Sequence, residues 1–593
     1  MAAEIDVAVL IVGGGGAGLT ASMLLSQLGV ETWLVSVLPT TSTLPKAHVL
    51  NQRAMEILAD VGVADEIYAR GTPLAHMRCT GWYAGLAGPR PEHGRCIARQ
   101  EAWGAGYTDT DWVAASPFAS ANLPQIRLEP ILKARAEALA PGRVRFHHEL
   151  LTVEQDGDGV RALVVDRDRG EAYRVNARYL LACDGGRTVG RLLGVEMEGQ
   201  RGLANEISVH MSADLSPWAR DPEVLIRWLW IPETGALAVL VPMGPDRWGP
   251  ESEEWVFHLN YADGDLRGVD DAQVEADMRR ALGIGDHPLT IHRISRWSLE
   301  GVVAARFQVG RIFLVGDAAH RHPPTGGLGL NSAIHDAHNL CWKVAAVLRG
   351  EASAGLLATY EAERRPVDAR NVQRSLENAF NHFAIGEALG VQPGAPADAN
   401  WEAVRRLWSE GPEGAAQRRR VRRAVASQSM EFREHDVEYG YRYASTAVVP
   451  DGSAVPPSPD PIRVYAPCTR PGHPLPHAWV EDDDGTRVAL MQLVRPGRFL
   501  LIAGEEGEAW CRAARAIARD GDLALDAVTV GHLDGDYLDL RCQWLQQREI
   551  GAEGAILVRP DRCIAWRALG AAADARATLG AALEQILARR PPD

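Results

Sequence analysis

The chain has 593 residues, about four times the length of a typical domain of roughly 150 residues, so several domains are expected. Hydrophobic residues make up 46% and charged residues 23%, a mixture that excludes a mainly disordered chain. A net charge of −15 disfavours a nucleic-acid partner, and no apolar run is long enough to predict a membrane span. The eight cysteines show neither C-x-x-C nor zinc-binding spacing, so we predict no metal site and reduced thiols in a cytoplasmic protein.

The first 36 residues have the pattern of a βαβ unit. Residues 6–12 predict a buried strand, residues 17–28 a helix and residues 32–35 a second strand. The G-x-G-x-x-G sequence between the first strand and the helix permits a tight turn and lets a pyrophosphate approach the helix N-terminus. The second strand ends in serine, where an acidic residue that holds a ribose hydroxyl is usual. A glycine-rich turn without a ligand is the alternative. The predicted cofactor contacts here are Gly13, Gly15, Gly16, Ala17, Gly18 and Ser36.

Two further motifs follow predicted strands. Asp184 and two glycines come after residues 179–182, a pattern that fits an ordinary turn as well as a binding loop. Asp317 comes after residues 311–315, where a carboxylate can accept hydrogen bonds from sugar or ribityl hydroxyls. Two prolines, a glycine-rich run and a helix beginning near Gly329 then predict close approach of backbone to a flat ring.

Composition and periodicity divide the chain into five segments. We expect residues 1–200 and 301–450 to form one dinucleotide-binding domain with added helices. Residues 201–300 carry several strand-like stretches and predict an inserted sheet that binds substrate. The proline-rich residues 451–461 predict a linker, and residues 462–593 a separate domain.

The three motifs, in this order and spacing, resemble the class A FAD-dependent aromatic (phenol) monooxygenases. Flanking runs that carry the resemblance include residues 45–48, 51–56, 123–130, 339–343 and 360–366. Residues 320–325 and 431–436 point most closely to 2,4-dichlorophenol 6-monooxygenase-like hydroxylases. The resemblance implies an α/β fold: a Rossmann-type FAD-binding domain, an inserted β-sheet substrate domain as in p-hydroxybenzoate hydroxylase, and a C-terminal thioredoxin-like domain. Without a C-x-x-C pair, that last domain is expected to serve packing or oligomerisation.

The same resemblance assigns further cofactor contacts. Lys46 stands where the family usually has arginine, and keeps the charge without the bidentate fork. Asp184 belongs to a motif that serves both FAD and NAD(P)H. The remaining expected FAD contacts are Gln125, Asp317, Pro324, Gly329, Leu330 and Asn331.

The implied reaction is hydroxylation of a phenol-type ring with O2 and either NADPH or NADH, through a C4a-hydroperoxyflavin. His322 and Pro323 lie next to the expected flavin ring and are the candidates for catalytic contact. Candidates for substrate contact on the predicted sheet are His210, Trp228, Trp230 and Met243, although a structural role in the core is the favoured interpretation for each of them. No residue is assigned as the base that deprotonates the substrate. A homo-oligomer is expected, with no membrane or nucleic-acid partner.

Several alternatives remain open. The substrate is a small degradable phenol, or a larger phenol or hydroxypyridine intermediate of natural-product biosynthesis; the FAD motifs do not distinguish these. A halogenase or flavin reductase on the same scaffold is a further alternative, although Trp228-Leu229-Trp230-Ile231-Pro232 departs from the W-x-W-x-I-P spacing of related halogenases. A non-catalytic flavin- or aromatic-binding protein is the alternative from another class.

Overall fold

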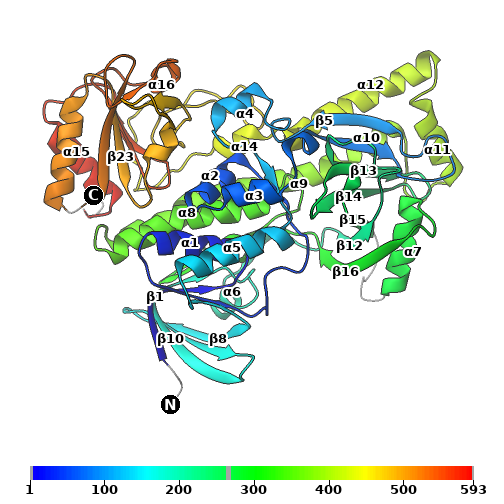
Figure 1. The fold of residues 1–593 in the computed structure, drawn as a ribbon, viewed down its shortest axis with the longest axis horizontal. Coiled ribbons are helices and arrows are strands. Elements are labelled where there is room, and N and C mark those ends of the chain that lie inside the picture. Colours follow the sequence, from blue (N-terminus) through cyan, green and yellow to red (C-terminus); the bar gives the residue numbers. More distant parts are fainter. Residues whose placement is uncertain (1–3, 262–268, 522, 590–593) are drawn as a thin grey trace.

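The computed structural model describes residues 4–261, 269–521 and 523–589. Three large sheets follow one another along its longest axis (Figure 1). The sheet that carries the N-terminus lies in the middle, a second sheet lies at the right of the view, and the C-terminal sheet lies at the left. In the described ranges, no helix is long and apolar enough to cross a membrane.

The central sheet has the strand order β18-β19-β10-β1-β2-β7. Its middle strands β19, β10, β1 and β2 run parallel, and β1 is buried along most of its length, as expected for a sheet covered on both faces. An antiparallel ribbon, β8 and β9, extends from β10. The strands are β1 (Glu4–Val12), β2 (Thr32–Ser36), β7 (Val144–Phe146), β8 (His148–Gln155), β9 (Val160–Asp166), β10 (Glu171–Ala182), β18 (Gln308–Val309) and β19 (Ile312–Leu314).

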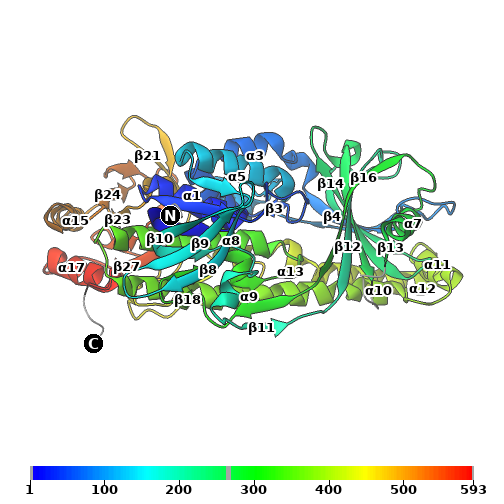
Figure 2. The ribbon, with the colours of Figure 1, turned by 90° about the horizontal axis from the view of Figure 1, so that it is seen from below.

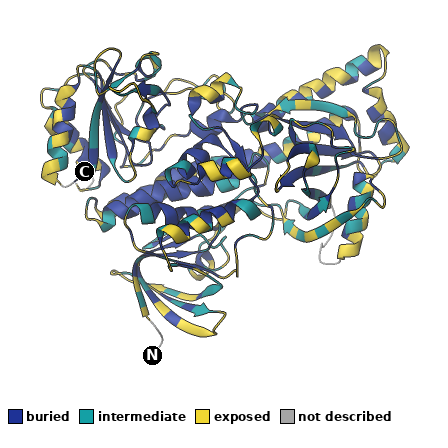
Figure 3. Ribbon diagram, viewed as in Figure 1, coloured by how far each residue is buried: buried dark blue, intermediate teal, exposed yellow. Residues whose placement is uncertain are grey.

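Helices α1 (Gly16–Gln27), α5 (Gln125–Leu139) and α8 (Leu328–Leu348) pack together beside this sheet. Figure 3 shows α8 buried over nearly its whole length, because other elements surround it. The predicted strand-turn-helix at the N-terminus is confirmed to within one or two residues at each boundary. Smaller elements on this part are α2 (Gln52–Asp60), α3 (Ala64–Arg70), α4 (Thr110–Ala115), α6 (Val189–Leu192), β3 (Val49–Leu50), β6 (Ala121–Asn122), β11 (Met197–Gln200), β17 (Gly301–Ala304) and β20 (His320–Arg321).

The second sheet has the order β16-β12-β15-β14-β13-β4-β5. Five of its strands come from the predicted insert: β12 (Asn205–Ala213), β13 (Val224–Ile231), β14 (Ala236–Gly244), β15 (Glu254–Tyr261) and β16 (Leu289–Ser298). The other two, β4 (Cys79–Ala84) and β5 (Cys96–Glu101), come from well before it. The sequence did not indicate them, because β4 is buried on both faces and shows no alternation of polar and apolar residues.

Each face of the second sheet is covered differently. One face packs against α7 (Asp271–Leu282). Part of the other face packs against a helical arm, residues 383–427. The arm projects at the right of Figure 1 and is seen along its length in Figure 2. The helices that follow α8 in the chain are α9 (Thr359–Asn381), α10 (Phe383–Leu389), α11 (Ala397–Arg406), α12 (Gly411–Ser427), α13 (Ser429–Phe432) and α14 (His435–Tyr439).

The C-terminal sheet has the order β22-β21-β25-β24-β23-β26-β27. Its core is a β-α-β unit followed by two antiparallel strands and a last helix. This is the arrangement expected of a thioredoxin-like domain. The elements are β21 (Trp479–Glu481), β22 (Arg487–Ala489), β23 (Phe499–Ala503), α15 (Glu508–Gly521), β24 (Leu525–Gly531), β25 (Tyr537–Leu538), α16 (Gln543–Gln547), β26 (Ala555–Val558), β27 (Ile564–Ala568) and α17 (Ala575–Ile586).

A buried ionic network joins the C-terminal part to the central part. Glu363 of α9 accepts hydrogen bonds from Lys343 of α8 at 2.7 Å and from Arg559 at 2.6 Å, and all three side chains are fully buried. Arg559 also pairs with Asp561. Burial favours the neutral acid, but the adjacent cations hold the pKa of Glu363 well below its usual value. The network is therefore charged and depends on every member being present.

Replacing Glu363 by glutamine is expected to lower the stability of the protein by about 3–5 kcal/mol, because it leaves two buried cations without their shared partner. The matched control is Glu66→Gln, which breaks the exposed α3 pair with Arg70 and should leave the thermal midpoint near that of the wild type. Calorimetry of both variants checks this, and equal midpoints would contradict a structural role for the network.

Candidate active site

The three motifs predicted from the sequence meet at one edge of the central sheet. β1, β10 and β19 are adjacent and parallel, so the turns that follow their carboxyl ends lie side by side. Backbone hydrogen bonds join these turns: the Cys183 amide donates to Val12, and the Val315 amide donates to Ala182. In open α/β sheets this edge is where ligands bind.

The glycines of the first turn are required by close packing. A Cβ on Gly18 would lie 1.9 Å from the Gly13 carbonyl oxygen, and a Cβ on Gly13 would lie 2.1 Å from the Cys183 oxygen. Gly13 also has a φ of +116°, a conformation that other residues rarely adopt. Gly15 caps α1 without any side chain, so no capping side chain competes with an anion for the first amides of the helix. The turn therefore fits the pyrophosphate of FAD.

A buried acid that the sequence analysis did not single out faces this turn. A carboxylate oxygen of Glu129, on α5, lies 3.5 Å from the position of a Cβ on Gly15. Burial raises the pKa of Glu129, against the opposing effects of the Ser42 and Gly16 amides and the Lys46 charge. Glu129 also accepts a hydrogen bond from Gln125, the first residue of α5. Its burial beside the N-terminus of α1 marks Glu129 as a candidate site residue, but this position is visible only in the fold.

The predicted contacts around the turn lie in the same region. Ser36 is buried at the end of β2, with its Cβ 3.0 Å from the position of a Cβ on Gly14. Lys46 is exposed, and its φ of 45° places it in the left-handed region. The Gln125 amide donates to the carbonyls of Pro45 and Ala47, which fixes the Lys46 segment against α5.

The two aspartates differ in how their carboxylates are used. Asp184 accepts hydrogen bonds from the amides of Gly186, Thr188 and Val189, at 2.7–3.1 Å, and so shapes its own turn. Asp317 is exposed, and its carboxylate has no hydrogen-bond or ion-pair partner within the described ranges. A free carboxylate at this edge of the sheet is suited to accepting hydrogen bonds from the hydroxyl groups of a cofactor.

The loop at the start of α8 is fixed against the N-terminal part. Asn331 accepts a hydrogen bond from the Asn51 amide and donates to the carbonyls of Val49 and Gly327. Leu330 reaches the first motif, because its Cδ1 lies 2.6 Å from the position of a Cβ on Gly16. Pro324 and Gly329 lie on the same loop, with Pro324 exposed.

Both ring nitrogens of His322 have protein partners. Its Nε2 lies 3.0 Å from His320 Nδ1, and its Nδ1 lies 3.4 Å from the hydroxyl of Ser375. The edge of its ring lies 3.8 Å from the position of a Cβ on Gly329. Pro323, the other predicted catalytic contact, directly follows His322 in the chain and is buried. The geometry therefore makes His322 a support for the loop rather than a free acid or base.

The predicted substrate contacts share one face of the second sheet but differ in access. Trp230 is covered by α10, because its indole ring lies 2.3 Å from the position of a Cβ on Gly386. His210 is tied to Glu254 at 2.7 Å, which also pairs with Arg127 of α5. Trp228 stacks on His382 with ring centroids 3.8 Å apart. Met243 packs among Val241 and Val256 on the part of the face not covered by the arm.

His48 is a site residue that the sequence analysis missed. Its Nδ1 lies 2.6 Å from Asn122 Oδ1, and the Asn122 amide nitrogen donates to the hydroxyl of Thr72 at 2.7 Å. With its nitrogen on Thr72, Asn122 turns its oxygen toward His48; His48 in this arrangement carries its proton on Nδ1 and leaves Nε2 as an acceptor. Burial lowers the pKa of His48, which keeps the ring neutral. No local motif indicates this, because Thr72 and Asn122 are distant in sequence.

His48 lies where the loop and the second sheet approach each other. The next residue, Val49, is 3.7 Å from the position of a Cβ on Gly327 and packs in one cluster with Leu225 of β13. On the sheet, burial and the proximity of His48 lower the pKa of His258 to about 4. An uncharged basic imidazole thus stands between the loop at the start of α8 and the predicted substrate face.

Comparison with known proteins agrees with this geometry. Residues 6–375 match the family described as FAD binding domain, and residues 468–590 match the C-terminal region of aromatic-ring hydroxylases. The 2,4-dichlorophenol 6-monooxygenase of Cupriavidus pinatubonensis is 36% identical, over 100% of this chain and 98% of its own length. The tetracenomycin B2 monooxygenase-dioxygenase of Streptomyces olivaceus is 34% identical, with 99% of both chains covered. The crystal structure of the flavin-dependent monooxygenase PieE with FAD and substrate superimposes with a TM-score of 0.91 at 37% identity, covering 99% of this chain and 100% of that one.

The fold and the glycine turn define a flavoprotein with its dinucleotide at the carboxyl edge of the central sheet. Since the matched family covers more than half of the chain, this protein belongs to the FAD-binding family of aromatic-ring hydroxylases and is an FAD-dependent monooxygenase. The predicted cofactor FAD is confirmed by this membership.

Replacing Gly18 by alanine is expected to abolish FAD binding, because the new Cβ would overlap the Gly13 carbonyl. The matched control is Gly190→Ala. Gly190 lies next to the second motif, and a Cβ added there would meet only open space. Flavin content is read from the visible spectrum of each purified protein, and circular dichroism confirms that both are folded. A yellow Gly18→Ala protein would contradict this reading of the turn.

Proposed function

We propose that the protein hydroxylates an aromatic ring that already carries a hydroxyl group, using O2 and NADPH or NADH. The observation that carries this proposal is the neutral His48, which lies between the loop at the start of α8 and the second sheet and has a free Nε2. When bound, FAD supplies the redox and oxygen chemistry of the reaction. The residues of the chain bind the ring, exclude water around it and remove its hydroxyl proton.

The proton step assigned to His48 is simple. The O–H bond of the substrate breaks, its electron pair stays on the oxygen, and the proton goes to Nε2 of His48. The resulting oxyanion donates electrons into the ring, which makes its carbons better nucleophiles. Asn122 and Thr72 hold the imidazole in the correct tautomer throughout. The imidazolium then returns its proton to solvent.

A basic cavity supports docking of NADPH or NADH. The cavity has a volume of about 830 Å³ and opens between the turns of the second and third motifs, at Gly186 and Asp317. Its lining includes four arginines, Arg187, Arg191, Arg201 and Arg321, against three acids, Glu196, Glu300 and Asp317. Arg321 pairs with Glu300, whereas Arg187 and Arg191 lie beside the second motif. Arginine is the side chain best suited to phosphate groups, and a dinucleotide carries at least two of them. A co-substrate held here would lie beside the turn that is expected to contact FAD.

Relatives of two kinds bear on the size of the substrate. Those that act on small phenols include a phenol 2-monooxygenase of Pseudomonas, 34% identical to this chain. Solved relatives also include aklavinone-11 hydroxylase with FAD and aklavinone, 30% identical with a TM-score of 0.77. We therefore keep a larger phenol or hydroxypyridine intermediate of natural-product biosynthesis as the second candidate. The eight free cysteines support a reducing, cytoplasmic location.

The first experiment follows NADH and NADPH oxidation by the yellow holoenzyme with a panel of phenols, hydroxypyridines and polycyclic phenols. Stimulation by one aromatic, with one oxygen atom added to the product, would establish the reaction and its substrate class. Stimulation only by polycyclic compounds would favour the second candidate. Bound FAD without stimulation by any class would contradict the hydroxylase proposal.

Replacing His48 by asparagine is expected to lower the rate of product formation about 10²–10⁴-fold, the usual contribution of a general base. Because the pKa of His48 is lowered by burial, wild-type activity should persist below pH 6.5, the usual pKa of histidine. Bound 4-nitrophenol reports the proton transfer directly, since its oxyanion is yellow; the wild type should show the oxyanion and the variant should not. His287→Asn, away from this site, is the control, and an unchanged spectrum in His48→Asn would exclude the role.

Replacing both Arg187 and Arg191 by alanine is expected to raise KM for the pyridine nucleotide about tenfold or more, with FAD content unchanged. Each lost charge-assisted hydrogen bond to phosphate contributes about 1.5–3 kcal/mol. Arg169→Ala, on the exposed turn between β9 and β10, is the matched control. Steady-state kinetics with saturating aromatic substrate measures the effect, and an unaltered KM would place the nucleotide elsewhere.

A further inference from the structure

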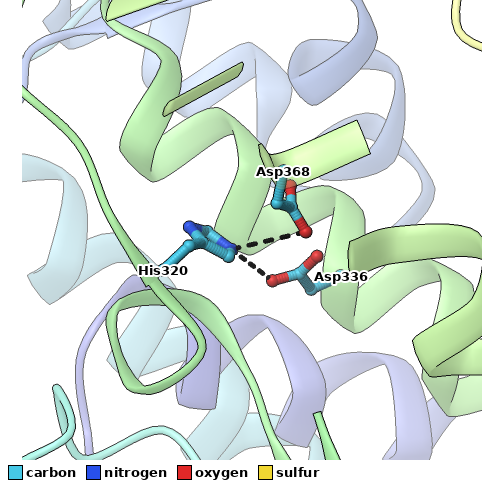
Figure 4. A group of neighbouring side chains, drawn as sticks. All are labelled: His320, Asp336 and Asp368. Atoms are coloured by element: carbon cyan, nitrogen blue, oxygen red, sulfur yellow. Dashed lines mark hydrogen bonds and ion pairs between the residues drawn. The ribbon is translucent and has the colours of Figure 1, made fainter. Parts of the chain in front are cut away.

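The side chains of His320, Asp336 and Asp368 point toward one another (Figure 4). Asp336 also contacts the turn that carries Asp317. His320 Nε2 lies 2.8 Å from Asp336 Oδ2 and 3.7 Å from Asp368 Oδ2. Arg364 pairs with Asp336 at 2.8 Å and with Asp368 at 2.7 Å. None of the four side chains is exposed. We call these four residues the histidine–arginine cluster.

The histidine–arginine cluster has the ligand types of a metal site but the charge balance of an ionic network. His320, Asp336 and Asp368 place ligand atoms within 4.8 Å of one another. Arg364, however, already pairs with one oxygen of each carboxylate. Burial raises the pKa of Asp368 to about 7, so above that pH two cations and two anions sum to zero, and a divalent cation would add a net charge to a fully buried site. The arrangement therefore favours a protonated His320 over a bound metal.

The cluster contacts the two segments that are expected to hold FAD. Asp336 accepts a hydrogen bond at 3.0 Å from the amide of Gly316, which begins the turn that carries Asp317. On the other side, His320 Nδ1 contacts His322 Nε2, and the His322 ring packs against Gly329. His320 thus lies between the turn of the third motif and the loop at the start of α8.

The hydrogen bonds fix the charge on His320. Although burial disfavours the cation, the carboxylates of Asp368 and Asp336 raise the pKa of His320 to about 9. Burial and the His320 charge lower the pKa of His322, so His322 is the neutral member of the pair. His320 therefore donates from both nitrogens, one to Asp336 and one to His322.

We propose that His320 is a buried cation at neutral pH that raises the reduction potential of the bound FAD, and that Asp368 limits this effect. His320 acts as a positioning residue, because His322 lies between it and the loop at the start of α8. Reduction adds negative charge to the flavin, and a fixed positive charge nearby favours the reduced form. Burial makes this effect stronger than that of a surface charge, because water and salt screen it less.

The groups that face His320 decide how this effect depends on pH. They are Asp336 from α8, Asp368 and Arg364 from α9, and His322 and Asp317 from its own segment. The ring of Phe307 covers a further side. As pH rises through about 9, His320 loses its proton and the flavin potential should fall more steeply than in a variant without this histidine.

The test measures the midpoint potential of FAD by equilibration with redox dyes, in the holoenzyme without aromatic substrate or NADPH. The pH is set at about 8, because burial raises the pKa of Asp368 to about 7 and the pKa of His320 is about 9, so that both groups are charged. His320→Gln removes a positive charge and should lower the ratio of reduced to oxidised flavin about tenfold at a fixed potential, about 30 mV for this two-electron couple. Asp368→Asn removes a negative charge and should shift the potential in the opposite direction. Tyr443→Phe, which changes a neutral contact of Arg364, is the matched control and should not shift it.

Opposite shifts in the two variants are the result that a merely structural role would not give. Shifts of the same sign, or none in either variant with FAD bound, would overturn the proposal. If His320→Gln fails to retain FAD, the Asp368→Asn variant decides: a raised potential supports the proposal and an unchanged one overturns it. Stoichiometric metal in the purified protein would also overturn it. The inference rests on the FAD assignment, and the measurement does not depend on which aromatic compound is hydroxylated.

Discussion

One buried carboxylate, that of Asp336, organises the centre of the molecule. It accepts hydrogen bonds from the Gly316 amide, from His320 and from Arg364. Asp336 thus joins α8 to the end of the central sheet, to the segment that carries His320, and to α9. Burying a carboxylate is costly unless it is paired and hydrogen-bonded, and here the neighbouring cations and the amide together bond both of its oxygens. Asp336 is strongly acidic because of these partners, despite its burial. The position of the three turns therefore depends on a charged group that no solvent reaches.

Helix α8 is the element through which these constraints act together. Asn331 in its first turn fixes the loop at residues 49–51, Asp336 in the middle fixes the third motif, and Lys343 near its end pairs with Glu363. A helix that is buried all round can hold several parts in register, because no face of it is free to move against solvent (Figure 3). The cofactor motifs and the C-terminal sheet are thus positioned on one rigid helix.

Local pattern was sufficient for much of the fold. The glycine turn, Asp317 and the strand at 555–558 could be predicted because each depends on neighbours within a few residues. β4 could not, since it joins the second sheet by pairing with β13, more than 120 residues away, and β5 joins that sheet only through β4. The same is true of His48, whose tautomer is set by Thr72 and Asn122, and of Trp230, which is covered by a later helix. The sequence predicts His322 as a catalytic contact, but its hydrogen bonds to His320 and Ser375 are visible only in three dimensions.

The contribution of β4 and β5 to the second sheet has a mechanical consequence. The polypeptide passes between the central part and this sheet on both sides of residues 79–101, and again on both sides of residues 205–298. A sheet attached by a single pair of linkers can swing about a hinge, whereas attachment through two separate pairs restrains that rotation. The second sheet is thereby held in one orientation relative to the central sheet.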